Sequence, residues 1–264
     1  MADAVILEKR GPLAFITLNR PDAMNALGLS DHEALIAIWE EYRDDDDLSV
    51  AIITGAGDQS FCSGADLKAY TPLLGEMSSY ELRALSGKHG FGGITRSFEL
   101  WKPVVAAING YAISGGLELA LACDIRICSA NAEFGSQEVR WGFHHCDGGN
   151  IRLPLIVGLG NALRMTLTGE RIDATEAHRI GLVSDVVEAE RLMEEAEKIA
   201  TRIAENAPLG VRSAKESTLR SIGRTLEDAV HLEHMFFASL AKTEDYVEGP
   251  RAFAEKRDPK FQGR

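Results

Sequence analysis

Residues 108–118 read Ile108-Asn109-Gly110-Tyr111-Ala112-Ile113-Ser114-Gly115-Gly116-Leu117-Glu118, and a similar alternation of strand and helix signals recurs before about residue 190. The apolar run Pro103–Ile108 leads into this stretch and has the composition of a buried strand. Small residues then form a turn, and Gly115–Cys123 has the pattern of a short helix. A strand, a glycine-rich turn and a helix in this order predict a layered α/β core.

The same alternation extends outward on both sides of this stretch. Further strands are predicted at Ala4–Leu7, Leu13–Leu18, Val50–Thr54, Ile125–Cys128 and Ala132–Phe134. Ser30 and Glu33 fit a capping box at the start of a helix. After about residue 190 only helical patterns remain, so we predict a core over residues 1–190 and a helical C-terminal region over residues 191–264. The pattern alone does not separate a doubly wound sheet from other layered α/β folds.

Composition excludes several classes of protein. The 264 residues include 28 Lys and Arg against 40 Asp and Glu, a net charge of −12, which argues against binding to nucleic acid or to an anionic membrane. The four cysteines show no metal-site spacing, and the N-terminus has no targeting signature. No apolar stretch approaches the roughly 20 residues that cross a membrane. We therefore expect a reduced, cytoplasmic protein.

Two turns are candidates for binding an anionic oxygen through backbone amides. Gly115 opens a helix, where N–H groups are unpaired and the helix dipole is positive. Gly64 permits a sharp turn that can direct the Ala65 amide into a cleft. The simpler interpretation of that second segment is a strand-to-helix turn with Asp66 at the helix start. Nucleotide phosphate binding is the rival use of Gly115, but neither GxGxxG nor GxxxxGK[ST] is present.

Glu118 and Glu138 are the candidate acid–base groups. Glu118 follows Gly115 by three residues on the same predicted helix face. Its apolar neighbours are expected to raise the pKa of its carboxyl group, which suits it to proton transfer. It could instead be a helix-dipole partner, and Glu138 could be a solvated loop residue. Two carboxylates beside paired amides suit acid–base chemistry next to a carbonyl. A glycosidase would also use two carboxylates, although only three Trp are present as sugar platforms.

These segments together resemble the crotonase superfamily, also called the enoyl-CoA hydratase/isomerase family. The resemblance covers nearly the whole chain in order. Its motifs are Leu18–Pro21 with Asn25–Leu27, Phe61–Lys68, Ala107–Glu118, Cys123–Arg126, Phe134–Gly142, Thr168-Gly169, Ala177–Val183 and Phe253–Arg257.

The resemblance implies a crotonase-like spiral of ββα turns with a helical C-terminal region, assembled as a homotrimer or a dimer of trimers. It implies that Ala65 and Gly115 supply the oxyanion-hole amides and that Glu118 and Glu138 are catalytic. It further implies a CoA groove lined by Ala65, Asp66, Leu67, Lys68 and Gly115, with Phe253 and Lys256 contacting CoA, often from a neighbouring subunit.

The reaction implied is hydration of the 2,3 double bond of an enoyl-CoA thioester, with the water held between Glu118 and Glu138. An acyl-CoA thioester is the expected partner; no cofactor and no metal are expected, because CoA is part of the substrate. A double-bond isomerase, a thioester hydrolase or a C–C lyase on the same fold are the alternatives. A non-catalytic acyl-CoA-binding or RNA-binding relative is an alternative from another class, disfavoured by the paired glutamates and the acidity.

One segment departs from the family pattern. Where hydratases have Pro-Gly, this chain has His145-Cys146, preceded by His144 and followed by Asp147-Gly148-Gly149. We expect Asp147 to be a helix N-cap. His144 and His145 are predicted to line the acyl pocket, with the stretch 71–98 shaping it. A catalytic Cys–His pair is the alternative, without a visible orienting partner.

Overall fold

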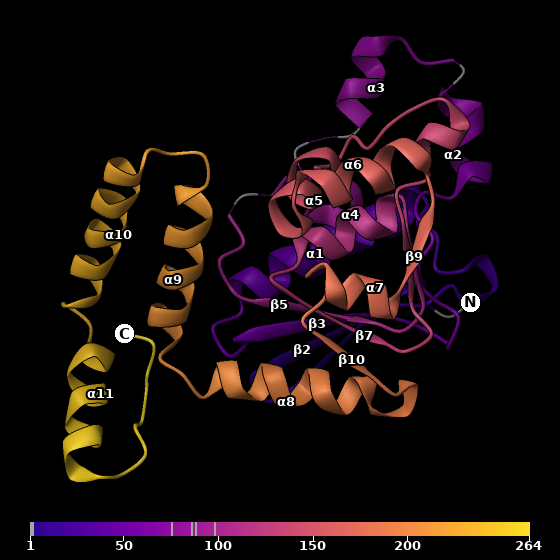
Figure 1. Ribbon diagram of the computed structural model, residues 1–264. Helices are drawn as coiled ribbons and strands as arrows, with labels where there is room; N and C mark the ends of the chain where they lie inside the picture. Colours follow the sequence, from indigo (N-terminus) through magenta and orange to yellow (C-terminus); the bar gives the residue numbers. More distant parts are fainter. Residues whose placement is uncertain (1–2, 75, 86, 88, 98) are drawn as a thin grey trace.

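A computed structural model of the chain describes residues 3–74, 76–85, 87, 89–97 and 99–264, and it contains two sheets (Figure 1). The stretch 71–98, predicted to shape the acyl pocket, lies partly outside these residues. The first sheet has the strand order β1-β2-β3-β5-β7-β10 and the second has the order β4-β6-β8-β9. The strands are β1 (Val5–Arg10), β2 (Leu13–Leu18), β3 (Val50–Gly55), β4 (Ser60–Cys62), β5 (Val104–Ile108), β6 (Tyr111–Ile113), β7 (Ile125–Ser129), β8 (Glu133–Gly135), β9 (Arg171–Asp173) and β10 (Asp185–Val187).

Successive turns of the chain each add one strand to each sheet. β3 and β4, then β5 and β6, then β7 and β8 follow this rule, and a helical segment comes after each pair. Neighbouring strands from β2 to β10 pair in parallel in the first sheet, while β1 and β2 form an antiparallel hairpin. The predicted spiral of ββα turns is therefore confirmed.

The first sheet is buried on both faces, which explains its uninterrupted apolar strands. One face carries Ala51 and Ile53, which pack into the large core with α1 (Leu29–Asp44) and α4 (Gly115–Ala122). The other face carries Val50 and Ile52, which pack against helix α8 (Leu192–Ala204). In Figure 1, α8 runs beneath the sheet. It lies within the predicted C-terminal region, yet it packs against the core; the boundary at residue 190 stays a prediction.

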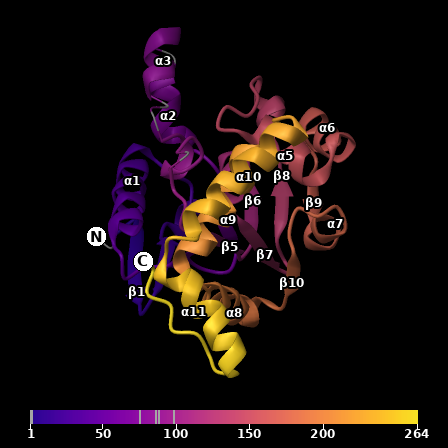
Figure 2. The same ribbon diagram turned by 90° about the vertical axis from the view of Figure 1, so that its left-hand side faces the viewer.

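Three helices form an arm beside the core, here called the C-terminal arm (residues 208–264). They are α9 (Pro208–Ser221), α10 (Leu226–Leu240) and α11 (Glu244–Glu255). Figure 1 shows the arm standing to one side, and Figure 2 shows it in front of the core. The helical C-terminal region is confirmed.

The remaining helices surround the sheets. They are η1 (Pro21–Ala23), α1 (Leu29–Asp44), α2 (Leu67–Leu74), α3 (Ser79–Leu85), η2 (Phe91–Gly93), α4 (Gly115–Ala122), η3 (Glu138–Trp141), α5 (Gly149–Val157), α6 (Leu159–Thr168), α7 (Ala174–Arg179), η4 (Ala189–Arg191) and α8 (Leu192–Ala204). Across the described ranges, none of the helices combines the length and the apolar character that a membrane span requires.

The capping box predicted at Ser30 is wrong. Helix α1 begins two residues earlier than that prediction places it, at Leu29, with Gly28 as its N-cap. The carboxylate of Asp31 accepts a hydrogen bond from the Gly28 N–H at 2.7 Å. It also forms an ion pair with Arg20 at 2.9 Å. Asp31 is the third helical residue, the position whose side chain binds the N-cap backbone in a capping box. Glu33 lies two residues beyond that position.

Candidate active site

The Ala65 amide is left free by a single β-bridge between Leu27 and Ala65. The Leu27 N–H donates to the Gly64 carbonyl and the Asp66 N–H donates to the Leu27 carbonyl, both at 2.9 Å. In a parallel bridge of this kind, the N–H of the intervening residue points away from its partner. Within the described part of the chain, the Ala65 N–H has no hydrogen-bond acceptor.

The Gly115 amide lies beside this segment at the first residue of α4. Gly64 has φ +99°, and a Cβ added there would lie 3.3 Å from the Gly115 nitrogen. The Gly115 N–H has no acceptor among residues that the structure describes, as the first turn of a helix requires. The structure therefore brings together the two amides that sequence reasoning selected.

Gly115 also packs closely against an aromatic ring. A Cβ at this position would lie 2.8 Å from two carbons of Phe91, a residue of η2 that is 9% exposed. Glycine at this position thus permits close packing against the Phe91 ring.

Glu118 lies one turn further along α4 and is buried at 3% exposure. Its Oε1 accepts hydrogen bonds from the Asp147 N–H at 2.7 Å and the Gly149 N–H at 2.9 Å. These bonds hold the loop that precedes α5. They leave Oε2 as the oxygen available to other groups.

Glu138 is the first residue of η3 and is also buried, at 4% exposure. Its Oε2 has no hydrogen-bond partner among the described residues. A buried polar atom without a partner is costly, and at a candidate active site it indicates a position that a reacting group fills.

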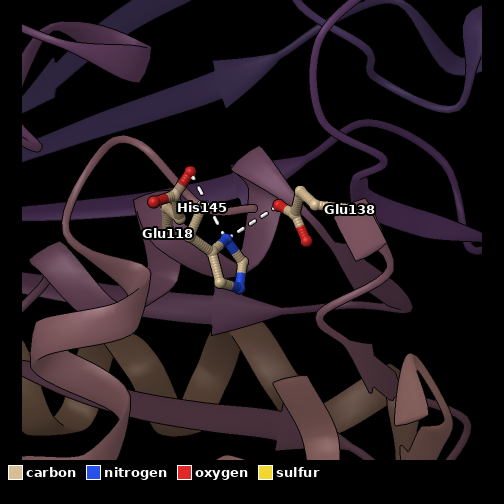
Figure 3. Close-up of side chains that lie close together, drawn as sticks. All are labelled: Glu118, Glu138 and His145. Carbon is tan, nitrogen blue, oxygen red and sulfur yellow. Dashed lines mark ion pairs between the residues drawn. The ribbon is translucent and has the colours of Figure 1, made fainter. Parts of the chain in front are cut away.

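His145 occupies the space between the two glutamates (Figure 3). Its Nδ1 lies 2.7 Å from Oε1 of Glu138 and 3.5 Å from Oε2 of Glu118. Both contacts are ion pairs by distance, but neither ring nitrogen has an aligned hydrogen bond within the described residues. Sequence reasoning assigned this space to a water molecule and placed His145 in the acyl pocket; the imidazole lies at the acid–base groups instead.

The charge state of His145 follows from these neighbours. Burial alone would lower its pKa, but the contacts with Glu118 and Glu138 outweigh burial and raise the pKa to about 9. The imidazole is therefore protonated at neutral pH. The three residues also present ligand atoms within 4.8 Å of one another, a grouping that could hold a metal ion.

The other two members of this loop are further from the glutamates. His144 is exposed, and its Nδ1 lies 2.6 Å from the His145 carbonyl. The Cys146 sulfur lies 3.3 Å from Oδ2 of Asp147. Desolvation, with the charges of Asp147 and Glu118, raises the pKa of Cys146 to about 12. A thiol in this state is a poor nucleophile, and it is not paired with the imidazole.

Asp147 does not cap α5, so that prediction is wrong. Gly148 is the N-cap, with φ +100°, and this turn directs the Asp147 carboxylate away from the helix. Its Oδ1 accepts hydrogen bonds from the Phe91 N–H at 3.1 Å and from the Thr95 hydroxyl at 3.2 Å. The same oxygen forms an ion pair with Arg96 at 2.9 Å. Asp147 thus joins the loop that precedes α5 to the segment 91–96.

The predicted CoA-groove residues sit at the start of α2. Asp66 accepts from the Lys68 N–H at 3.2 Å and forms an ion pair with Arg20 at 2.9 Å. Leu67 is 49% exposed, as a groove residue must be. Arg20, which sequence analysis quoted only within a motif, anchors this turn by binding both Asp66 and Asp31.

Phe253 and Lys256 lie at the end of α11. Phe253 is 86% exposed, and Lys256 is the C-cap with φ 55°. Figure 1 shows α11 far from α4, on which Glu118 lies. The chain therefore does not bring these two residues to its own acid–base groups.

Comparison with known proteins identifies the family of the chain. The family model described as enoyl-CoA hydratase/isomerase matches residues 8–264. The chain is 44% identical over 259 residues to (E)-benzylidenesuccinyl-CoA hydratase of Thauera aromatica, covering 98% of this chain and 99% of the relative. It is 41% identical over 268 residues to carnitinyl-CoA dehydratase of Proteus mirabilis, covering 100% of both.

A solved structure agrees as well. The enoyl-CoA hydratase of Bacillus anthracis superposes with a TM-score of 0.92 at 36% identity, covering 99% of this chain and 100% of that one. The family predicted from the sequence motifs is confirmed. The chain belongs to the enoyl-CoA hydratase/isomerase family.

Proposed function

We propose that this protein is an enoyl-CoA hydratase, a hydro-lyase that adds water across the 2,3 double bond of an enoyl-CoA thioester. The observation that carries the proposal is the pair of buried glutamates, with two backbone amides that have no acceptor among the described residues. The amides of Ala65 and Gly115 polarise the thioester carbonyl and stabilise the enolate that forms. Glu118 assists deprotonation of the water, and Glu138 supplies the proton that bonds to the α-carbon.

No further cofactor enters this mechanism. The developing negative charge is on the thioester oxygen, where backbone amides and the N-terminus of α4 stabilise it. CoA is part of the substrate. The direct test is incubation with crotonyl-CoA and longer enoyl-CoA thioesters while the absorbance of the conjugated thioester is followed; absence of hydration in every case would overturn the proposal.

We expect an acyl group that carries a polar, branched or cyclic feature. His145-Cys146, preceded by the exposed His144, stands where typical hydratases have Pro-Gly. The relatives above are named for benzylidenesuccinyl-CoA and carnitinyl-CoA. We expect kcat/KM for crotonyl-CoA to be about 10-fold or more below that of the best branched, aryl or oxygenated substrate. The measurement is kcat/KM across this panel for wild type and His144→Ala. A flat profile in both proteins would contradict the pocket role.

The C-terminal arm supports assembly into a homotrimer or a dimer of trimers. Leu226, Met235 and Phe237 are exposed at 80%, 70% and 53%, although apolar side chains of this size gain free energy on burial. A cavity of about 1010 Å³ separates α9 from the core. A neighbouring copy would cover the arm and receive Phe253 and Lys256 at its CoA groove.

Replacing Lys256 tests the CoA contact. Lys256→Ala is expected to raise KM for CoA thioesters about fivefold, the effect of losing one exposed charge pair of roughly 1 kcal/mol. KM for the matching pantetheine thioesters is expected to change little, because these lack the nucleotide phosphates. Lys198→Ala, on the exposed face of α8, is the matched control. Equal effects on the two substrate classes would contradict the placement of Lys256 at phosphate.

A further inference from the structure

The imidazole of His145 contacts both candidate acid–base groups through one atom. Nδ1 faces Oε1 of Glu138 and Oε2 of Glu118, at 2.7 Å and 3.5 Å. The side chain of His145 is fully buried, and those of Glu118 and Glu138 are 4% and 5% exposed. Nδ1 thus lies within ion-pair distance of both carboxylates and is shielded from solvent. Its N–H is not aligned with either carboxylate among the described residues, so transfer of its proton requires the accepting carboxylate to turn toward it.

Charge balance favours a proton at this atom. Two ionised carboxylates buried together are unfavourable unless a positive charge or a shared proton accompanies them. Among the described residues, His145 is the one cationic side chain within ion-pair distance of either glutamate. Arg96 pairs with Asp147, and Arg152 donates to the carbonyls of Asp147 and Thr95.

The ring is also held in position by its surroundings. Gly149 lies against it so closely that a Cβ at residue 149 would overlap the imidazole. The same residue donates its N–H to Glu118. The ring and the carboxylate are thus positioned by one turn of chain at the start of α5.

We propose that His145 is a proton-relay residue that stores the proton of the hydration reaction and passes it between the two glutamates. The proposal rests on the proposed hydratase function. The proton on Nδ1 moves to Glu138, and Glu138 delivers it to the α-carbon as the C–H bond forms. The oxygen of the water bonds to the β-carbon, and its proton goes to Glu118. Glu118 then returns this proton to Nδ1, so each turnover consumes one water and restores the enzyme.

The relay gives the reaction a defined alkaline limit. The two glutamates raise the pKa of His145 to about 9 against the effect of burial, so the stored proton is present at neutral pH. It is lost as the pH rises through about 9. Above that pH the cluster has no proton for the α-carbon, and kcat is expected to fall.

The first test is His145→Gln, with His178→Gln as the matched control, because His178 is an exposed histidine on α7. We expect kcat of His145→Gln to fall about 100-fold, the effect of losing one positioned proton-transfer group, with KM within about threefold of wild type. Its alkaline limit is expected to move to lower pH, because a carboxyl group must then hold the proton. Hydration at the wild-type rate with an unchanged pH profile would overturn the relay while leaving the hydratase assignment intact.

The second test needs neither a variant nor turnover. In the wild-type protein with ¹⁵N-labelled histidine, one of the seven histidines is expected to remain protonated until about pH 9. His32 is expected to titrate lower than usual, because burial lowers its pKa. Titration of all seven below pH 7.5 would overturn the relay. A wild-type enzyme that hydrates no enoyl-CoA would instead overturn the proposed function and the relay with it.

Discussion

Glu138→Gln is expected to lower kcat for enoyl-CoA hydration by about 10²–10⁴-fold, the effect of removing a positioned acid–base group. The amide is nearly the same size as the carboxyl group, but it can neither take the proton from His145 nor deliver it to the α-carbon. Binding of the thioester is expected to persist, because the amides of Ala65 and Gly115 are unchanged. The measurement is kcat and KM on a substrate that the wild type hydrates, with affinity for a saturated acyl-CoA measured separately.

Glu133→Gln is the matched control for this substitution. Glu133 lies five residues earlier on β8, where it forms an exposed ion pair with Arg171, and surface pairs contribute little. Its hydration rate is expected to match that of wild type. Activity of Glu138→Gln within about threefold of wild type would remove Glu138 from the mechanism.

Gly115→Pro is expected to lower kcat/KM by about 10²–10³-fold through loss of one oxyanion donor. Proline has no N–H, and it is well tolerated in the first turn of a helix. Both Pro and Ala add a Cβ that meets Phe91, where the added atom would lie 2.8 Å from ring carbons. Gly115→Ala therefore reproduces the packing change but keeps the amide.

The comparison of these two variants isolates the hydrogen bond. We expect Gly115→Ala to lose part of its thermal stability and to retain most of its activity, while Gly115→Pro loses both. Melting temperature and circular dichroism establish that each variant is folded. Equal activity in the two variants would locate the oxyanion donor at another residue.

The sequence predicted the features that depend on neighbouring residues. The unbroken apolar runs of β3 and β5 arise because the first sheet is covered on both faces, and such runs are visible without a structure. The position of Glu118, three residues after Gly115, follows from helix geometry. The amide of Gly115 could be selected as an oxyanion donor because the first backbone N–H groups of any helix have no partner within the helix.

The features that sequence reasoning missed depend on contacts between distant residues. His145 lies between Glu118 and Glu138 because two N–H groups of its loop bind Glu118, 29 and 31 positions away. Asp147 binds Phe91 and Thr95, 56 and 52 positions away. A local capping pattern cannot reveal such partners, and the positive φ of Gly148 that directs Asp147 away from α5 leaves no signal beyond the glycine itself.

The strand order of the two sheets has a consequence for biosynthesis. In both sheets, β1-β2-β3-β5-β7-β10 and β4-β6-β8-β9, the order in space is the order along the chain. Each strand that leaves the ribosome can therefore pair with an edge that has already formed, and none has to enter between two paired strands. Sheet growth can thus keep pace with translation, and the groups from Ala65 to Gly149 are all synthesised before α8 covers the sheet and before the C-terminal arm is made.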